Sequence, residues 1–121
     1  MKPRAVDFVS CNVTDMARAE AFYRDVLGLD VAIPWGGPGR RFPEFEAGGT
    51  TISLTSLPQL PSGAIVALAV DDARAVVEEL RGKGVQIVME PLETRVCYMA
   101  LIADPDGNQI LIHQRKDGTA G

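Results

Sequence analysis

Residues 9–29, VSCNVTDMARAEAFYRDVLGL, decide the fold, because their pattern recurs at residues 66–85, VALAVDDARAVVEELRGKGV. In each copy an apolar strand ends at an aspartate, a helix containing Ala-Arg-Ala follows, and a glycine precedes the next strand. The second copy begins 57 positions after the first, at Val66 rather than Val9. A repeat of this length indicates two copies of one supersecondary unit.

Around this repeat, hydrophobic alternation and turn residues predict the same order of elements twice. The first copy is expected to contain a strand, a helix capped by Thr14 or Asp15 and ended near residue 27 by Gly28, and three more strands. The second is expected to repeat this order, with Asp71 or Asp72 as the helix cap. The sequence therefore predicts a single α+β domain over residues 1–121, made of module 5–57, module 64–114 and a flexible tail at 115–121.

Length and charge limit the classes of function. A chain of 121 residues is long enough for one domain with a real core. Its 12 basic and 16 acidic residues leave a net charge of -4, which argues against nucleic acid and anionic membrane as partners. The first residues, MKPRAVDF, lack the apolar stretch of a signal peptide, so we expect a cytoplasmic protein. Cys11 and Cys97 lie in apolar runs and are expected to be buried free thiols.

Two motifs carry a resemblance to a known family. Residues 13–28 follow the pattern Val-x-Asp-x-x-x-Ala-x-x-Phe-Tyr-x-x-x-Leu-Gly, and residues 104–108 read Asp-Pro-Asp-Gly-Asn. With their spacing, they resemble the vicinal oxygen chelate superfamily of glyoxalase I, extradiol dioxygenases and bleomycin resistance proteins. The resemblance covers nearly the whole chain and implies a curved eight-stranded mixed sheet around a cavity, helices on its outer face, and a homodimer. It leaves the chemistry open, because one fold hosts many functions.

The metal-dependent members of that family take four ligands from the first and last strands of the two modules. Carried over strand by strand, these positions hold Phe8, Ser53, Ile65 and Leu111. A single hydroxyl among three apolar side chains cannot hold a divalent metal, which needs imidazole, carboxylate or thiolate donors. The chain also has only one histidine. The resemblance therefore implies a member without metal ligands, and we expect neither a metal nor another cofactor.

Candidate catalytic groups are few. His113 is expected near the end of the last strand, where a solvent-facing or hydrogen-bonded side chain is the favoured interpretation and a base at the cavity rim is the alternative. Glu46 shares a strand face with Glu44, and a solvated edge explains this more simply than a pair of catalytic carboxylates. No Ser-His-Asp or Cys-His pairing is apparent in the sequence.

Strand alternation places small and apolar side chains on the concave face, with a few hydroxyls among them. Such a lining is typical of sites for small organic molecules, although the protein's own side chains can equally fill this face. Aromatic residues here either stack on a planar ligand or anchor a loop on the core. The predicted ligand-binding set is Phe8, Ser10, Trp35, Phe42, Ser53, Ile65, Tyr98, Leu111 and His113.

These observations predict a metal-independent binding protein for a hydrophobic or planar small molecule, a class that includes antibiotics. The alternative is a divergent metal-free enzyme of the same superfamily that works in the same cavity through His113 or Glu46. A third interpretation is a structural or regulatory dimer with a vestigial cavity. A classical glyoxalase or ring-cleaving dioxygenase is not expected, because the ligand positions carry no suitable donors.

Overall fold

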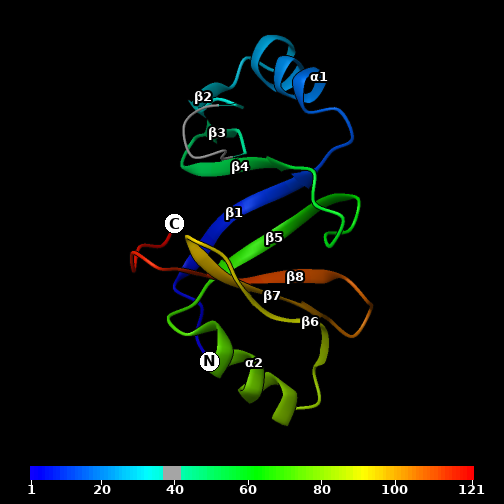
Figure 1. Ribbon diagram of the computed structural model, residues 1–121, viewed down its shortest axis with the longest axis vertical. Coiled ribbons are helices and arrows are strands. Elements are labelled where there is room, and N and C mark those ends of the chain that lie inside the picture. Colours follow the sequence, from blue (N-terminus) through cyan, green and yellow to red (C-terminus); the bar gives the residue numbers. More distant parts are fainter. Residues whose placement is uncertain (37–41) are drawn as a thin grey trace. The chain divides into compact units, whose positions relative to one another are not determined.

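The computed structural model describes residues 1–36 and 42–121. The chain forms two compact units, residues 8–65 and residues 1–7 together with 66–121 (Figure 1). The order of elements is βαβββ twice, with eight strands, two helices, and both parallel and antiparallel pairs. The predicted α+β class with two tandem modules is confirmed. Part of the loop predicted at 34–43 lies outside the described residues.

The first unit holds four paired strands in the order β2-β3-β4-β1. β1 runs parallel to β4, with Ser10 opposite Ser53, and the other neighbours are antiparallel. The first three residues of β1 belong to the second unit. The elements are β1 (Ala5–Asn12), α1 (Met16–Ala21), the π-helical turn η1 (Phe22–Val26), β2 (Asp30–Ile33), β3 (Glu44–Ala47) and β4 (Thr50–Thr55).

The first helix begins as predicted and ends differently. Asp15 is its N-cap, and its carboxylate accepts a hydrogen bond from the Arg18 N–H at 3.1 Å. The α-helical part ends at Ala21, six residues before the predicted end, and a wider π-type turn follows. In that turn the Leu27 N–H donates to the Phe22 carbonyl five residues earlier. Gly28 then ends the segment with φ of 72°, a conformation that glycine adopts readily.

Helix α1 covers the core of the first unit. Phe45 and Leu54 are fully buried in a cluster with Met16, and Cys11 and Val13 of the first strand and its end pack against it. Cys11, expected to be buried, is a half-buried free thiol on the helix side of the strand. The neighbours of Cys11 on β1 therefore point to the opposite face of the sheet.

The second unit repeats the arrangement with strand order β5-β8-β7-β6, and α2 lies along one face of these strands (Figure 1). β5 runs parallel to β8, and β8 is antiparallel to β7. Asp72 caps α2 by accepting a hydrogen bond from the Ala75 N–H at 3.0 Å. The elements are β5 (Gly63–Ala69), α2 (Ala73–Gly82), β6 (Gln86–Glu93), β7 (Cys97–Ala103) and β8 (Gln109–Arg115).

The alternation of β8 sets the two faces of this unit. Ile112 is fully buried against α2, in a cluster with Val77 and Ala100. Residues 111, 113 and 115 of β8 therefore point to the face away from the helix. Cys97 on β7 lies opposite Arg115, so it points to the same face. An imidazole, a guanidinium and a thiol thus share one end of this strand pair.

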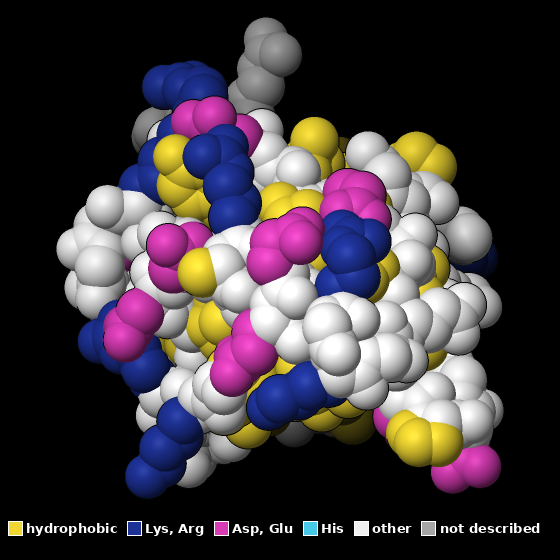
Figure 2. All heavy atoms as spheres, turned by 90° about the horizontal axis from the view of Figure 1, so that it is seen from below, with side chains coloured by type: hydrophobic (Ala, Val, Ile, Leu, Met, Phe, Trp, Pro, Cys, Tyr) yellow, Lys and Arg dark blue, Asp and Glu magenta, His cyan; other side chains and the backbone are white. Residues whose placement is uncertain are grey.

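Charged side chains of both signs lie on the surface. Figure 2 shows basic and acidic side chains interspersed on the face that it displays. Several of them form ion pairs, among them Arg81 with Glu90 and Lys83 with Glu79. Neither helix of the described chain has the length and apolar character that crossing a membrane requires.

Candidate functional site

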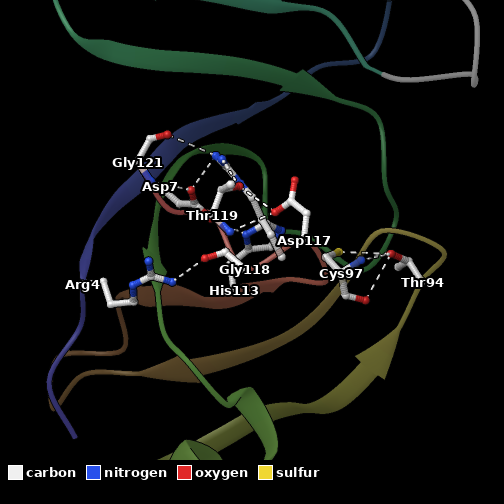
Figure 3. Close-up of polar contacts among 10 residues, drawn as sticks. Arg4, Asp7, Thr94, Cys97, His113, Asp117, Gly118, Thr119 and Gly121 are labelled. Atoms are coloured by element: carbon white, nitrogen blue, oxygen red, sulfur yellow. Dashed lines mark hydrogen bonds and ion pairs between the residues drawn. The ribbon is translucent and has the colours of Figure 1, made fainter.

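The second unit contains a buried ion cluster centred on Asp7. Its side chain is only 1% exposed, although carboxylates are rarely buried without partners. His113 Nδ1 donates to Asp7 Oδ2 at 2.5 Å, and Arg115 Nη2 contacts Asp7 Oδ1 at 2.6 Å. The Gly121 N–H donates to Oδ1 at 3.1 Å (Figure 3). One carboxylate therefore binds two side chains of β8 and the end of the described chain.

These contacts set the ionisation of the pair. Burial alone raises the pKa of Asp7, but the hydrogen bond from His113 and the charges of His113 and Arg115 hold that pKa below its usual value. Burial alone lowers the pKa of His113, but hydrogen bonds to Asp7 and Cys97, with the charges of both groups, raise it to about 9. The imidazole is therefore a cation at neutral pH, with Asp7 as its counter-ion.

Cys97 extends this cluster with a thiol. Its Sγ lies 3.1 Å from the Thr94 hydroxyl, and its side chain lies on the same face of the strand pair as His113. Burial raises the pKa of Cys97, but the bonds to His113 and Thr94 and the positive charges of His113 and Lys116 bring it below its usual value. Figure 3 shows Cys97 and Thr94 on one side of His113, with Asp7 on the other. We call Asp7, His113 and Cys97 the thiol–imidazole–carboxylate cluster.

Sequence reasoning anticipated only one member of this cluster. His113 is a buried, hydrogen-bonded residue at the end of the last strand, in line with the favoured interpretation. Asp7 and Cys97 were missed, and no Cys-His pairing was expected. Cys97 is buried and free of a disulfide as predicted, but it contacts an imidazole rather than apolar neighbours alone. An available signal was Asp7, the only charged residue of β1, since a buried carboxylate needs a partner.

The hydroxyl-bearing residues of the first unit belong to a second hydrogen-bond network, whose role is structural. Ser10 lies 3.2 Å from the Thr55 hydroxyl, which donates to Asn12 Oδ1 at 3.0 Å. The same oxygen accepts from the Leu57 N–H, and Asn12 Nδ2 donates to the carbonyls of Leu57 and Leu60. The alternation of a strand puts Ser10 and Asn12 on one face of β1, and their shared partner Thr55 agrees with this. Asn12 fastens the connector after β4.

Replacing Asn12 by alanine is expected to lower the free energy of unfolding by about 2 kcal/mol, because partly buried backbone groups lose their partners. Urea denaturation of the variant and of wild-type protein measures this difference. Gln59→Ala is the matched control, since Gln59 is exposed on the same connector. An equal effect of both changes would show that Asn12 does not hold the connector.

The other predicted residues of the first unit differ in burial. Ser53 and Ile65 are buried, whereas Phe8 is partly buried. Phe42 packs on the core below α1. Trp35 is 50% exposed.

Two hydrogen bonds in this unit are accepted by acidic side chains. The Trp35 N–H donates to Glu20 Oε2 at 2.7 Å, which ties the start of this loop to the helical segment. Glu46 is exposed and accepts a hydrogen bond from the Thr51 hydroxyl at 2.6 Å. The geometry of Glu46 therefore matches a solvated strand edge.

In the second unit the predicted residues divide between two faces. Leu111 is buried on the face that carries His113. Tyr98 lies on the helix side, where Arg74 is 4.6 Å and Lys116 is 5.1 Å from the centre of its ring. Tyr98 and His113 therefore do not meet at one site, and the aromatic ring already stacks with two cations.

Two surface grooves occur among the described residues. One of about 510 Å³ lies in the first unit beside α1, and one of about 260 Å³ lies at the start of α2. Tyr98 lines the second, together with Arg74 and Gln114. None of the other predicted ligand-binding residues lines either groove.

The donor set does not fit a metal ion. In the part of the chain that the structure describes, no three His, Cys, Asp or Glu side chains gather where they could hold one. His113 Nδ1, the nitrogen nearest an acidic partner, is engaged with Asp7. The aligned positions in the second half of the fold hold Ile65 and Leu111, both buried. No reaction step through a metal is therefore derived for this protein.

Comparison with known proteins assigns this chain to a family. Residues 5–112 match the model of the Glyoxalase/Bleomycin resistance protein/Dioxygenase superfamily. The chain has no match among the curated proteins. Its fold is similar to that of a Legionella pneumophila protein described as an NAD-dependent benzaldehyde dehydrogenase, with 19% identity, a TM-score of 0.73, and 90% and 98% of the two chains covered.

Two further solved structures are similar to this chain. Methylmalonyl-CoA epimerase from Mycobacterium tuberculosis has 21% identity and a TM-score of 0.66, with 93% of this chain and 88% of that chain covered. TnmS3, an antibiotic-binding protein from Streptomyces sp. CB03234, has 29% identity and a TM-score of 0.43, with 96% and 99% covered. The match over residues 5–112, together with the two βαβββ modules, shows that this chain belongs to the Glyoxalase/Bleomycin resistance protein/Dioxygenase superfamily.

Proposed function

We propose that this member of the superfamily binds a small organic molecule without a metal ion. The observation that carries the proposal is the state of His113, the only imidazole of the chain. Its Nδ1 donates to Asp7 at 2.5 Å, and it also hydrogen-bonds to Cys97, so it serves the buried cluster rather than a metal. The four positions aligned with metal ligands carry one hydroxyl and three apolar side chains, which fits this interpretation.

The chemistry of the described residues favours a hydrophobic or planar ligand. Ligand sites of proteins are mostly apolar with a few orienting polar groups, as in the predicted set. Trp35 supports the planar class, because half of its surface is exposed and an indole ring offers a stacking face. As the only tryptophan, it is also a built-in reporter of binding.

The test is a fluorescence titration of Trp35 with a planar anthraquinone antibiotic and a naphthalene sulfonate dye, both in excess chelator. We expect saturable quenching, and at about 100 times the dissociation constant a stabilisation of roughly 2.7 kcal/mol. Zinc, nickel and ferrous ions are expected to leave the melting temperature unchanged. Stabilisation by a metal that chelator reverses would contradict the proposal, as would the absence of binding across a broad panel of planar and apolar compounds.

The affinities of Trp35→Phe and Trp35→Ala show whether the ligand stacks on the ring at position 35 or only lies near it. The phenyl ring keeps a stacking face, so we expect Trp35→Phe to retain most of the affinity and Trp35→Ala to lose at least about tenfold, which corresponds to roughly 1.4 kcal/mol. The dye's own fluorescence reports binding to both variants. Equal affinities of the two variants would place the ligand away from Trp35.

A second function is favoured by the Asp7–His113 pair. An imidazolium held by a buried carboxylate is a proton donor at neutral pH, so a metal-free enzyme of this family would use His113 as a general acid. Any compound that stabilises the protein is tested for conversion by mass spectrometry. The enzyme hypothesis expects His113→Gln to abolish turnover and spare affinity. The homodimer and the cytoplasmic location stay predictions.

A further inference from the structure

We propose that Cys97 is a nucleophilic site that captures small α,β-unsaturated carbonyl compounds by conjugate addition. The proposal stands on the thiol–imidazole–carboxylate cluster of the second unit. It is independent of non-covalent binding near Trp35, so either proposal can fail without the other.

The backbone holds the thiol at a defined place. Cys97 begins β7, and the Thr94 hydroxyl accepts hydrogen bonds from the N–H groups of Val96 and Cys97 at 3.2 and 3.0 Å. The same hydroxyl lies 3.1 Å from Sγ. The hydroxyl proton can go either to the Cys97 carbonyl, to which it donates at 3.2 Å, or to a sulfur anion at 3.1 Å, which competes for it. The turn therefore orients Sγ and can stabilise it as a thiolate.

The imidazole next to the thiol is oriented by a third group. Cys97 is opposite Arg115, and His113 lies two residues earlier on the same face of β8. From this position His113 lowers the pKa of Cys97, and it donates through Nδ1 to Asp7 at 2.5 Å. A nucleophile, an imidazole on the same face of the strand pair, and a carboxylate that orients the imidazole form an arrangement typical of activated nucleophiles.

The charges around the thiol also favour its thiolate form. His113 and Arg115 of β8 are the cations on the face of Cys97, and Lys116, which follows β8 and lies over the Tyr98 ring on the helix side, acts on the thiol through its charge. Arg115 is paired with Asp7, and Lys116 donates to Glu93 of β6 at 2.6 Å. The positive charges of His113 and Lys116 lower the pKa of Cys97. The thiol and the imidazole can therefore exist as a thiolate–imidazolium pair near neutral pH.

The reaction balances with these groups alone. Sγ attacks the β-carbon of the unsaturated carbonyl and forms an S–C bond, while the C=C electron pair moves to the carbonyl as an enolate. The imidazolium of His113 gives its proton to the α-carbon, and the carbonyl reforms. His113 is left neutral and regains a proton from solvent, so no oxidant or reductant is needed. The product is a stable thioether.

Burial selects small reagents. Cys97 is 6% exposed, whereas the neighbouring Val96 is 70% exposed, so the thiol lies just below the surface at one end of the strand pair. Met99 shares its face of β7 and is only partly buried, so an apolar side chain lies beside the thiol on that strand. A short acyclic enone is therefore expected to react, and a bulky maleimide is expected to react far more slowly.

The experiment uses the full chain with Cys11→Ser, which leaves Cys97 as the single thiol. Methyl vinyl ketone is the probe, and the rate of single-adduct formation is followed by mass spectrometry between about pH 5 and 10. The same variant unfolded in urea provides the reference for an unperturbed thiol. We expect the pH of half-maximal rate to lie at least about one unit lower in the folded protein, a tenfold higher thiolate fraction at neutral pH. No adduct is expected with Cys97→Ser.

Two variants assign the roles of the partners. With Cys11→Ser present, His113→Gln is expected to raise the midpoint and to slow addition of methyl vinyl ketone more than displacement by iodoacetamide, which needs no proton donor. Thr94→Val keeps the shape of the side chain, leaves the imidazole in place, and is expected to raise the midpoint by a smaller amount. Circular dichroism confirms that each variant is folded.

The same measurements can contradict the proposal in three ways. A folded midpoint equal to that of the unfolded chain shows that the cluster does not activate the thiol. A folded protein that forms no adduct shows that Cys97 is closed to reagents. If His113→Gln slows the reactions with methyl vinyl ketone and iodoacetamide equally, His113 does not act as the proton donor in the addition.

Discussion

Asp7→Asn is expected to lower the free energy of unfolding by roughly 3–5 kcal/mol, the range seen when one partner of a buried ion pair is removed. The amide keeps the shape of the carboxylate but loses its charge. His113 and Arg115 then lie side by side without a counter-ion, and one donor that the carboxylate accepted is left unpaired. For a domain of this size the melting temperature is expected to fall by on the order of 10 °C or more.

The matched control for this prediction is Asp71→Asn. Asp71 also forms an ion pair, with Arg4 at 3.4 Å, but its side chain is 84% exposed. Exposed pairs contribute little, so this change is expected to stay within about 0.5 kcal/mol of wild type. Urea denaturation of the two variants and wild-type protein measures both effects. A loss below about 1 kcal/mol in Asp7→Asn would show that the cluster tolerates an unpaired cation.

The second large effect is a pH dependence of stability that comes from His113. The pKa of this group is raised from about 6.5 to about 9 in the folded protein. A raised pKa gives stability that is fully present below the unfolded value and is lost as the pH rises through the folded value. The window of loss therefore runs from about pH 6.5 to beyond pH 9, and its size is on the order of 3 kcal/mol.

The contribution of His113 to stability is measured as the difference in unfolding free energy between wild type and His113→Gln at several pH values. We expect the difference to be large near pH 6 and to shrink toward pH 10. The lowered pKa of Cys97 acts with the opposite sign, since its contribution is present above its unfolded pKa and is lost as the pH falls. Cys97→Ser, measured in parallel, separates this contribution from that of His113.

Nuclear magnetic resonance gives a direct check on the same prediction. Because the chain has a single histidine, its imidazole proton signal needs no assignment. The signal is expected to titrate with a midpoint near 9 in wild type and at a lower pH in Asp7→Asn, because the raising partner is neutralised. A wild-type midpoint at or below about 6.5 would contradict the ion pair.

Local patterns were sufficient for the order of elements, because they depend on neighbouring residues. Asp15 and Asp72 cap their helices as expected, since a side-chain oxygen reaches only the N–H groups of the first turn. The π-type turn at Phe22–Val26 was not expected. Its hydrogen-bond pattern differs from that of an α-helix by one residue, and hydrophobic periodicity over so short a segment cannot separate the two.

The candidate site could not be read in the same way. Alternation along β8 placed Leu111 and His113 on one face, but Asp7 lies 106 positions from His113 and Cys97 lies on another strand. Their meeting depends on strand order and register, which are set by the packing of the whole unit. Tyr98 shows the same limit, because its place beside Arg74 and Lys116 depends on where α2 packs.

The sequence by itself determined the two βαβββ modules, the α+β class, the likeness to the superfamily and the absence of metal donors at the aligned positions. These features depend on residue type and spacing along the chain. Only the tertiary structure decided that Asp7, His113 and Cys97 form one cluster with their pKa values shifted together. The physical reason is that burial and the distances between charges set these shifts, and both exist only once distant strands have paired.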